Sequence, residues 1–346
     1  MARNLLTKIL GRTLVAIAFF SVLTPPVAFS WNQATHAYIA DQIGATAGYD
    51  NNYEMWGSVA PDLFNFEFDP AVCPGWIADE LQGTNGDSAL KIWNAATSDR
   101  EQALAYGFVS HNGAWGDDHT AHVQCLTCGE DDGYILVKAK LLLSTPVDPA
   151  TPARTFADEF ATLGANADQQ LMIAHVITEY AVDIRVRNDL DPLIGRKLAT
   201  SSRSDTKRFA ELLVKTYAAD YAAYCFGGNV STAASVLTSI EKQHRNNMIF
   251  LGQALSQPEP VAVQLSAEQI AGIVPGFLGH PLPVSEAEAV GILKTGMDKS
   301  VEQCRGDYRK ELEATVEFVR DNLNAHGVSY APRTGSSIIK SSPRLP

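Results

Sequence analysis

Apolar side chains recur at helical spacing along most of the chain, and this pattern constrains the fold more than any other feature. Residues three or four positions apart lie on one face of a helix, so an apolar stripe at that spacing marks a helix that buries one side. Such stripes occur in residues 33–47, 166–187, 209–221, 231–254 and 308–323. Convincing alternation of apolar and polar residues, the pattern of a half-buried strand, is absent. The sequence therefore predicts an all-α fold.

Proline and glycine suggest how this helical chain is divided. Residues 255–284 are rich in both, and we expect them to connect a main helical domain, residues 31–254, to a C-terminal helical segment, residues 285–330. A serine at 285 and a glutamate at 288 form the capping-box pattern that starts a helix. Residues 331–346 are polar and are predicted to be a disordered tail.

The first thirty residues have the composition of a secretory signal peptide. Arg3, Lys8 and Arg12 give a positive start, an apolar run covers residues 13–23, and Ala28-Phe29-Ser30 offers small residues for cleavage. The apolar run is shorter than the ~20 residues that cross a bilayer, which favours cleavage over a membrane anchor. We therefore expect an exported protein, periplasmic or secreted, whose mature chain begins at Trp31.

Removing this segment leaves 316 residues and takes the formal net charge from −12 to −15, because it carries three cations and no acidic residue. A strongly acidic protein repels polyanions, so no stable nucleic-acid partner is expected. The length is ample for a large core. The oligomeric state stays open.

Five cysteines in an exported chain allow disulfides and leave at least one unpaired or intermolecular. Cys125 and Cys128 form a CxxC pair, which fits a local disulfide, half of a zinc knuckle or a redox pair. No second CxxC completes a zinc knuckle. We interpret the pair as a disulfide that staples a loop.

A short segment, residues 108–122, contains three histidines and two aspartates: His111, Asp117, Asp118, His119 and His122. So many polar groups are costly to bury unless something binds them, and imidazole with carboxylate suits zinc and related cations. The alternative is a solvated polar loop.

A second cluster consists of His175, Glu179 and Asp183 within an apolar helical segment. Positions four and eight residues apart share one helix face, so these side chains form a polar stripe. A metal ion would compensate its charge if the stripe is buried. The alternative is an exposed face with an ordinary His–Glu contact.

Two further pieces lie upstream. His36 follows the expected new N-terminus by five residues, and an α-amino group with a pKa near ~8 can lose its proton to a metal. Asp62 follows Pro61, a pair that by itself is simply a turn signal.

In this order, the pieces resemble the zinc-dependent phospholipase C family, including the amino-terminal domain of glycosylphosphatidylinositol-specific phospholipase D. The three-zinc single-strand nucleases are distant relatives of that family. The resemblance runs from Trp31 to about Asp183. It rests on a tryptophan freed by cleavage, Thr-His, Ala-Pro-Asp, Ser-His with a later Asp-x-x-x-His, and His-x-x-x-Glu.

The resemblance implies an all-α fold and two to three zinc ions held by Trp31, His36, Asp62, His111, Asp118, His122, His175 and Glu179. Trp31 would bind through its amino nitrogen and carbonyl oxygen, on the same metal as His36. Asp62 would touch the metal-bound water and is the candidate general base. Asp118 would bridge a pair of ions with His111 nearby. The last three residues would hold another ion.

Two departures from the family pattern are visible. The family has a further histidine between the positions of Asp62 and His111, and this chain has none there. Glu67, Asp69 or Asp79 could substitute, or one ion could be weakly held or missing.

The second departure is that the spacing from His111 to Asp118 is two residues longer than usual. Asp117 therefore competes with Asp118 as a ligand, and His119 competes with His122. The spacing within the Asp118–His122 pair is the family's, which favours that pair.

The expected function is an exported zinc-dependent phosphodiester hydrolase of the phospholipase C type, acting on a phospholipid or related headgroup and allowing peripheral contact with a membrane surface. One alternative is a three-zinc nuclease or nucleotidase, which would need aromatic residues to stack bases. The candidates for stacking, with the core as their default role, are Tyr38, Tyr53, Trp56, Phe64, Phe66 and Trp115. Another alternative is a non-catalytic zinc-binding protein with a degenerate site. We interpret His244, His280 and His326 as structural or surface residues.

Overall fold

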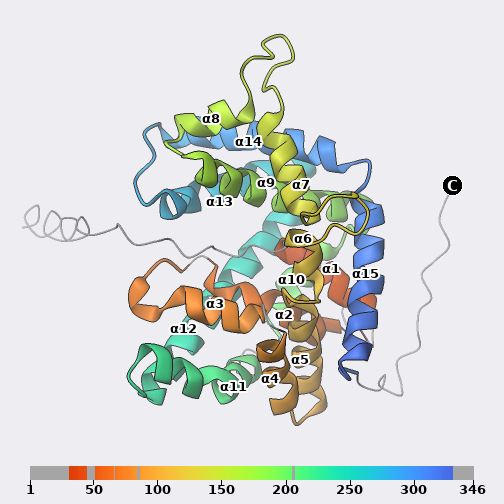
Figure 1. Ribbon diagram of the computed structural model, residues 1–346, viewed down its shortest axis with the longest axis vertical. Coiled ribbons are helices and arrows are strands. Elements are labelled where there is room, and N and C mark those ends of the chain that lie inside the picture. Colours follow the sequence, from red (N-terminus) through yellow and green to blue (C-terminus); the bar gives the residue numbers. More distant parts are fainter. Residues whose placement is uncertain (1–30, 45–50, 66, 84–85, 205–206, 330–346) are drawn as a thin grey trace, which may run out of the picture.

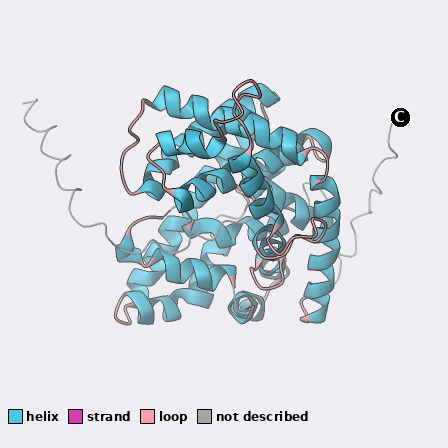
Figure 2. Ribbon diagram, turned by 45° about the horizontal axis from the view of Figure 1, so that its top comes forward, coloured by secondary structure: helices cyan, strands magenta, loops and turns pink. Residues whose placement is uncertain are grey.

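Fifteen α-helices and no β-strand make up the part of the chain that the computed structural model describes, which is residues 31–44, 51–65, 67–83, 86–204 and 207–329 (Figures 1 and 2). The predicted all-α fold is confirmed. The expected signal peptide and the expected disordered tail lie outside the described residues.

The α-helices are α1 (Gln33–Ile43), α2 (Asn52–Val59), α3 (Pro74–Gln82), α4 (Asp87–Ala95), α5 (Asp99–His111), α6 (Asp117–His122), α7 (Tyr134–Ser144), α8 (Phe156–Thr162), α9 (Ala167–Asp189), α10 (Ile194–Ser201), α11 (Arg208–Cys225), α12 (Val230–Leu255), α13 (Glu259–Leu278), α14 (Glu286–Cys304) and α15 (Tyr308–Ala325). Two 3₁₀-helices, η2 (Ala60–Phe64) and η3 (Pro70–Val72), lie between α2 and α3.

Helix α9 is the central element of the fold. Every residue from 173 to 186 is buried, because α1, α7, α13 and α14 all pack against it (Figure 1). Its start is fixed locally: Asn166 accepts a hydrogen bond from the backbone of Gln169, whose side chain accepts one in return. A long helix buried on all sides is a rigid support for the polar residues it carries.

The segment 255–284, expected to connect the main domain to the C-terminal segment, is largely helical, because α13 occupies most of it. Pro258 is the N-cap, and Pro260 lies in the first turn, where a helix leaves its backbone N–H groups unpaired anyway. Pro275 lies in the last turns, just before Gly279 ends the helix with φ +71°. The prolines therefore mark the ends of a helix.

Helix α13 is also the one helix among the described residues that is long and apolar enough to cross a membrane. Half of its most apolar stretch is buried, and it packs against α9, α12 and α14. That burial is what a core helix of a soluble fold shows as well. The C-terminal helices are likewise joined to the main body, since α14 packs on α9 and α15 on α1.

Two disulfides tie the chain together. Cys125 and Cys128 are bonded to each other, which confirms the predicted loop staple. Cys73 is bonded to Cys225 over a sequence separation of 152 residues and joins the start of α3 to the end of α11. Cys304 is the remaining, unpaired cysteine and is buried.

Candidate metal centre

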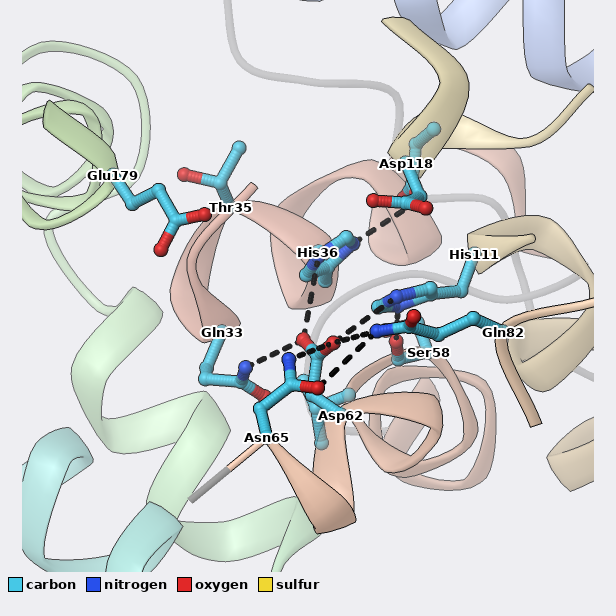
Figure 3. A network of polar contacts seen from close by, with 12 residues as sticks. Gln33, Thr35, His36, Ser58, Asp62, Asn65, Gln82, His111, Asp118 and Glu179 are labelled. Atoms are coloured by element: carbon cyan, nitrogen blue, oxygen red, sulfur yellow. Dashed lines mark hydrogen bonds and ion pairs between the residues drawn. The ribbon is translucent and has the colours of Figure 1, made fainter. Parts of the chain in front are cut away.

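The polar residues that the sequence singled out come from separate elements and meet inside the protein (Figure 3). They belong to α1, η2, α5, α6 and α9. Seven of these side chains are buried or nearly so: they form two groups of three donors, together with one aspartate that lies between hydrogen-bond donors.

The first group consists of His36, His111 and Asp117, all of which are buried. The two imidazole rings are stacked with their centroids 4.1 Å apart, and Nδ1 of His36 lies 3.0 Å from Oδ1 of Asp117. One nitrogen or oxygen atom from each residue lies within 4.8 Å of the others. Nδ1 of His111 donates to the carbonyl oxygen of Ser58 at 2.7 Å, which fixes the ring and turns Nε2 toward the centre.

The second group consists of His122, His175 and Glu179. The Nε2 atoms of the two histidines lie 2.8 Å apart, and Oε1 of Glu179 lies 2.9 Å from Nε2 of His175. Nδ1 of His122 lies 2.7 Å from Oδ1 of Asp118, so Asp118 orients this ring. Two ring nitrogens that face each other at such a distance need a proton or a cation between them.

In the second group, protonation of His175 is unfavourable. Burial lowers the pKa of His175 well below its usual value, and the neighbouring His122 adds to this effect. Burial raises the pKa of Glu179 well above its usual value, and the negative charge of Asp62 adds to the rise. A divalent cation would relieve both effects, since it binds a neutral imidazole and an ionised carboxylate at once. The donor set therefore fits zinc or a related ion.

Asp62 lies beside the first group but is surrounded by hydrogen-bond donors. Oδ2 accepts from Nε2 of Gln33 at 2.7 Å, and Oδ1 accepts from Nδ2 of Asn65 at 2.8 Å and from Nε2 of Gln82 at 3.2 Å. Nε2 of His111 lies 3.3 Å from Oδ1. Figure 3 shows the three carboxamides converging on this carboxylate.

The Asp62–His111 contact shifts the pKa values of both residues. Burial acts to raise the pKa of Asp62, but the charge and hydrogen bond of His111 outweigh it and hold this pKa below its usual range. Burial acts to lower the pKa of His111, but Asp62 outweighs it and raises this pKa to about 9. Before a metal binds, the pair is therefore an ionised carboxylate beside an imidazolium.

Asp183, the third member of the polar stripe on α9, has a different role from His175 and Glu179. Its carboxylate accepts hydrogen bonds from the backbone N–H groups of Ala34 and Thr35, at 3.2 and 2.8 Å, and from the Thr35 hydroxyl at 2.8 Å. The sequence correctly placed the stripe on one face, and its last residue holds the start of α1.

The structure also places the residues that the sequence left as alternative ligands in different surroundings. His122 joins His175, whereas Nδ1 of His119 lies 3.2 Å from the carbonyl oxygen of Gly113 and its ring stacks on Phe318. Of the two aspartates, Asp117 lies with His36 and Asp118 lies with His122. A bridge between two ions through Asp118 stays a prediction, and the geometry gives Asp117 the position next to the first group.

Glu67, Asp69 and Asp79 were considered as substitutes for the missing histidine, but two other residues of that interval lie against Asp62. Glu67 accepts from the backbone of Asp69, which in turn caps η3. From the interval between Asp62 and His111, the described side chains that bond to Asp62 are Asn65 and Gln82. Sequence reasoning missed both, and it also missed Gln33, because a carboxamide gives no metal-binding signal of its own.

Trp31 is fully buried beside this centre. Its indole Nε1 donates to the Thr120 hydroxyl at 3.0 Å, and its ring stacks on Tyr134 with centroids 5.4 Å apart. These contacts attach the first described residue of the chain to α6 and α7. Coordination by its α-amino group stays a prediction.

The aromatic residues that could have stacked a base are largely part of the core. Trp56 and Phe64 are buried, and Trp115 is covered by the ring of His326 at 4.1 Å. Tyr38 and Tyr53 are half-buried, and residue 66 lies outside the described part of the chain. The default interpretation as core is confirmed for Trp56, Phe64 and Trp115.

The remaining histidines lie outside both donor groups. His244 is buried and its Nε2 donates to the carbonyl oxygen of Val59, and His280 and His326 are exposed.

A third set of candidate ligands, Cys125, Cys128 and Glu311, is not a free thiolate site, because its two sulfur atoms form a disulfide. Glu311 instead accepts from the backbone of Leu126 and Thr127, at 2.8 and 2.9 Å. The loop is therefore held by the disulfide and by a buried carboxylate.

The fold and the site together define an all-α protein with a buried centre of histidine and carboxylate groups that could hold metal ions. Comparison with known proteins adds no relative: no family model matches the chain, and no curated protein or solved structure matches it.

Proposed function

We propose that this chain is an exported, zinc-dependent phosphodiester hydrolase of the phospholipase C type. The observation that carries the proposal is the pair of donor groups, His36–His111–Asp117 and His122–His175–Glu179. Five of the six residues are buried, and the groups are adjacent, since Asp117 and Asp118 follow each other in the chain and contact one group each. Structural zinc sites do not need two such groups side by side, whereas phosphoester hydrolysis uses paired ions.

Zinc bound at such groups would lower the pKa of water to ~7 and offset the negative charge of the phosphoryl oxygens. The protein supports this chemistry by fixing the ligands before substrate arrives. Ser58 holds His111 through its carbonyl oxygen, and Asp118 holds His122. A ligand fixed by a second hydrogen bond loses little conformational freedom when a metal binds.

Asp62 would contribute an ionised carboxylate close to the reacting phosphate. Against the opposing effect of burial, the charge and hydrogen bond of His111 hold the pKa of Asp62 below the usual range, so the carboxylate is ionised at neutral pH. Oδ1 already has several donors, whereas Oδ2 accepts from Gln33 and lies 3.8 Å from Nε2 of His36. Oδ2 therefore retains the capacity to accept a proton from, or to orient, an attacking water.

Substrate would approach from the second group. The side chain of His122 is 16% exposed, whereas those of His36, His111 and Asp117 are 0% exposed. A phosphodiester on a headgroup can therefore reach the centre at the His122 edge while the first group stays shielded from water. The acidic net charge and the burial of Trp56, Phe64 and Trp115 both favour a phospholipid-like substrate over a nucleic acid.

The test uses the chain from Trp31 onward, loaded with zinc, on three substrates: phosphatidylcholine vesicles, bis(p-nitrophenyl) phosphate and a single-stranded oligonucleotide. We expect the vesicles and the small diester to be hydrolysed, with loss of activity on chelation and recovery on adding zinc. Preference for the oligonucleotide would favour a nuclease. No hydrolysis by a zinc-loaded chain would mean a non-catalytic zinc-binding protein.

Helix α6 offers a matched pair of variants for this experiment. His122→Ala removes a ligand of the second group and should lower activity by about 100-fold or more. His119→Ala removes an imidazole that lies three residues earlier and faces Gly113 and Phe318, so activity should be retained. Equal losses in the two variants would contradict the assignment of the second group.

A further inference from the structure

A ring of three carboxamides surrounds Asp62 where the resemblance leads one to expect a third imidazole. Gln33 comes from α1, Asn65 from the residue after η2, and Gln82 from the last residue of α3. All three side chains are buried, and each donates to the carboxylate within 2.7–3.2 Å. Three unrelated elements therefore place the same chemical group on one anion.

The orientation of these carboxamides follows from the chemistry of their partner. An ionised carboxylate only accepts hydrogen bonds, and a carboxamide has one donating and one accepting end. The NH₂ ends must therefore face Asp62, and Gln82 also points Nε2 toward Oδ1 of Asn65, at 3.3 Å. An N–H group pointing at this position cannot bind a cation.

The lone pairs of Asp62 are also largely used. Oδ1 has Asn65, Gln82 and Nε2 of His111 within 3.3 Å, and Oδ2 accepts from Gln33, so both oxygens of Asp62 are already engaged with hydrogen-bond donors in the metal-free protein. Zinc prefers imidazole, thiolate and free carboxylate ligands, and a carboxamide offers at best a carbonyl oxygen, which suits harder cations.

Gln82 lies in the interval in which the family pattern has its further histidine, and it reaches the same aspartate. We infer that Gln82 takes the place of that histidine, and that the carboxamide ring holds Asp62 as a hydrogen-bonded anion instead of a metal ligand. The chain therefore binds two zinc ions, one at His36–His111–Asp117 and one at His122–His175–Glu179. This inference rests on the proposed function insofar as it takes those two groups to bind zinc.

In this arrangement Asp62, besides its proposed role toward the attacking water, also positions His111 of the first group. Its carboxylate lies 3.3 Å from Nε2 of His111, and the opposite ring nitrogen of His111 is held by Ser58. The imidazole is thus held at both ends, and a zinc ion at Nε2 would take the place of the contact with Asp62. The carboxamides would keep Asp62 in position.

The test is the zinc content per chain, measured by elemental analysis after dialysis, in the wild type and three variants. We expect two ions in the wild type and two in Asp62→Asn, because the amide keeps the shape and Asp62 is not a ligand. Gln82→His supplies the missing imidazole and should gain one ion, to three. Gln82→Asn, the matched control, keeps a carboxamide and should stay at two.

Three ions in the wild type, or the loss of one ion in Asp62→Asn, would overturn the inference and leave the proposed function standing. Gln82→His remaining at two ions while folded, as judged by circular dichroism, would also overturn it. If a variant does not fold, the wild-type count alone still decides between two ions and three. No zinc in the wild type would overturn the proposed function itself.

Discussion

At the scale of single residues, the start of α1 is capped by a side chain from the centre of the fold. The N-cap residue of α1, Asn32, makes no side-chain capping bond. Asp183 on α9 replaces it by accepting from the backbone of Ala34 and Thr35. The next residue is His36, so the helix that carries the second donor group also positions a ligand of the first.

Asp183→Ala should therefore destabilise the protein by about 2 to 3 kcal/mol, because it removes a cap and leaves buried N–H groups unpaired. Asp183→Asn is the matched control, since its amide oxygen can still accept. We expect it to cost about 1 kcal/mol or less. Urea unfolding of the two variants measures the difference, and equal losses would contradict the capping role.

The difference in stability between the wild type and Asp183→Asn should depend on pH. Burial raises the pKa of Asp183 from 3.8 to about 7, against the opposing hydrogen bonds of Thr35. The folded state then holds this proton more tightly than the unfolded state, so the stability contributed by Asp183 declines as pH rises from about 4 to about 7. The wild type should lose stability relative to Asp183→Asn over that range, and a constant difference would show that Asp183 does not titrate there.

Zinc binding should release protons at neutral pH. Asp62 raises the pKa of His111 to about 9, so His111 carries a proton in the metal-free protein at pH 7. It must lose this proton to bind a cation. Calorimetric titration at pH 7 in two buffers with different ionisation enthalpies should show release of about one proton from this residue. A heat of binding that is independent of the buffer would contradict this protonation state.

At the scale of elements, the crossing of α2 and α5 determines where two site residues lie. Each helix has a glycine at the crossing: a Cβ on Gly57 would lie 2.0 Å from the carbonyl oxygen of Leu104, and one on Gly107 would lie 1.9 Å from that of Glu54. The backbones therefore touch. Helix α5 ends at His111, and α2 leads directly into the turn that carries Asp62.

Gly107→Ala should separate these helices, lower stability by about 1 to 3 kcal/mol and reduce the zinc content. Gly272→Ala in α13 is the matched control, because no atom lies within 4 Å of the added methyl group. That substitution should stabilise the protein by up to about 1 kcal/mol and leave zinc content unchanged. Thermal unfolding and elemental analysis of both variants test the crossing, and an unaffected Gly107→Ala protein would show that the contact can relax.

The two disulfides should differ strongly in their contribution to stability. The Cys73–Cys225 bond closes a loop of about 150 residues and the Cys125–Cys128 bond closes a loop of about four. Loop-closure entropy predicts losses of about 5 and about 2 kcal/mol, respectively, when each pair is replaced by serine. Denaturant unfolding of the two double variants measures this ranking, and a reversed order would mean that local contacts of the short loop dominate.

At the scale of the whole molecule, most of the fold was predictable because its signals are local. The apolar stripes of α9 and α12 and the cap at Asn166 lie within a few residues of each other in the sequence. The sequence did not predict α13, because prolines at the two ends of this helix gave the segment the composition of a connection. The effect of a proline on a helix depends on its position along that helix, and composition does not report this position.

The residues of the candidate site likewise divide into those that local sequence predicts and those that only packing brings together. His175 and Glu179 were predictable because one helix brings them together. Gln33, Asn65 and Gln82 were not, because packing between different elements brings them to Asp62 and because carboxamides are common on protein surfaces. The division of Asp117 and Asp118 between two groups also depends on packing, since adjacent residues on a helix point in different directions.

The measurement that most directly tests the paired metal centre is anomalous X-ray diffraction at the zinc edge, on crystals of the chain that begins at Trp31. We predict two peaks, one about 2.0–2.2 Å from ligand atoms of His36, His111 and Asp117, and one at the same distance from His122, His175 and Glu179. The first peak should also lie within that distance of the Trp31 α-amino nitrogen. Peaks only at surface residues, or none at all in zinc-soaked crystals, would contradict the account.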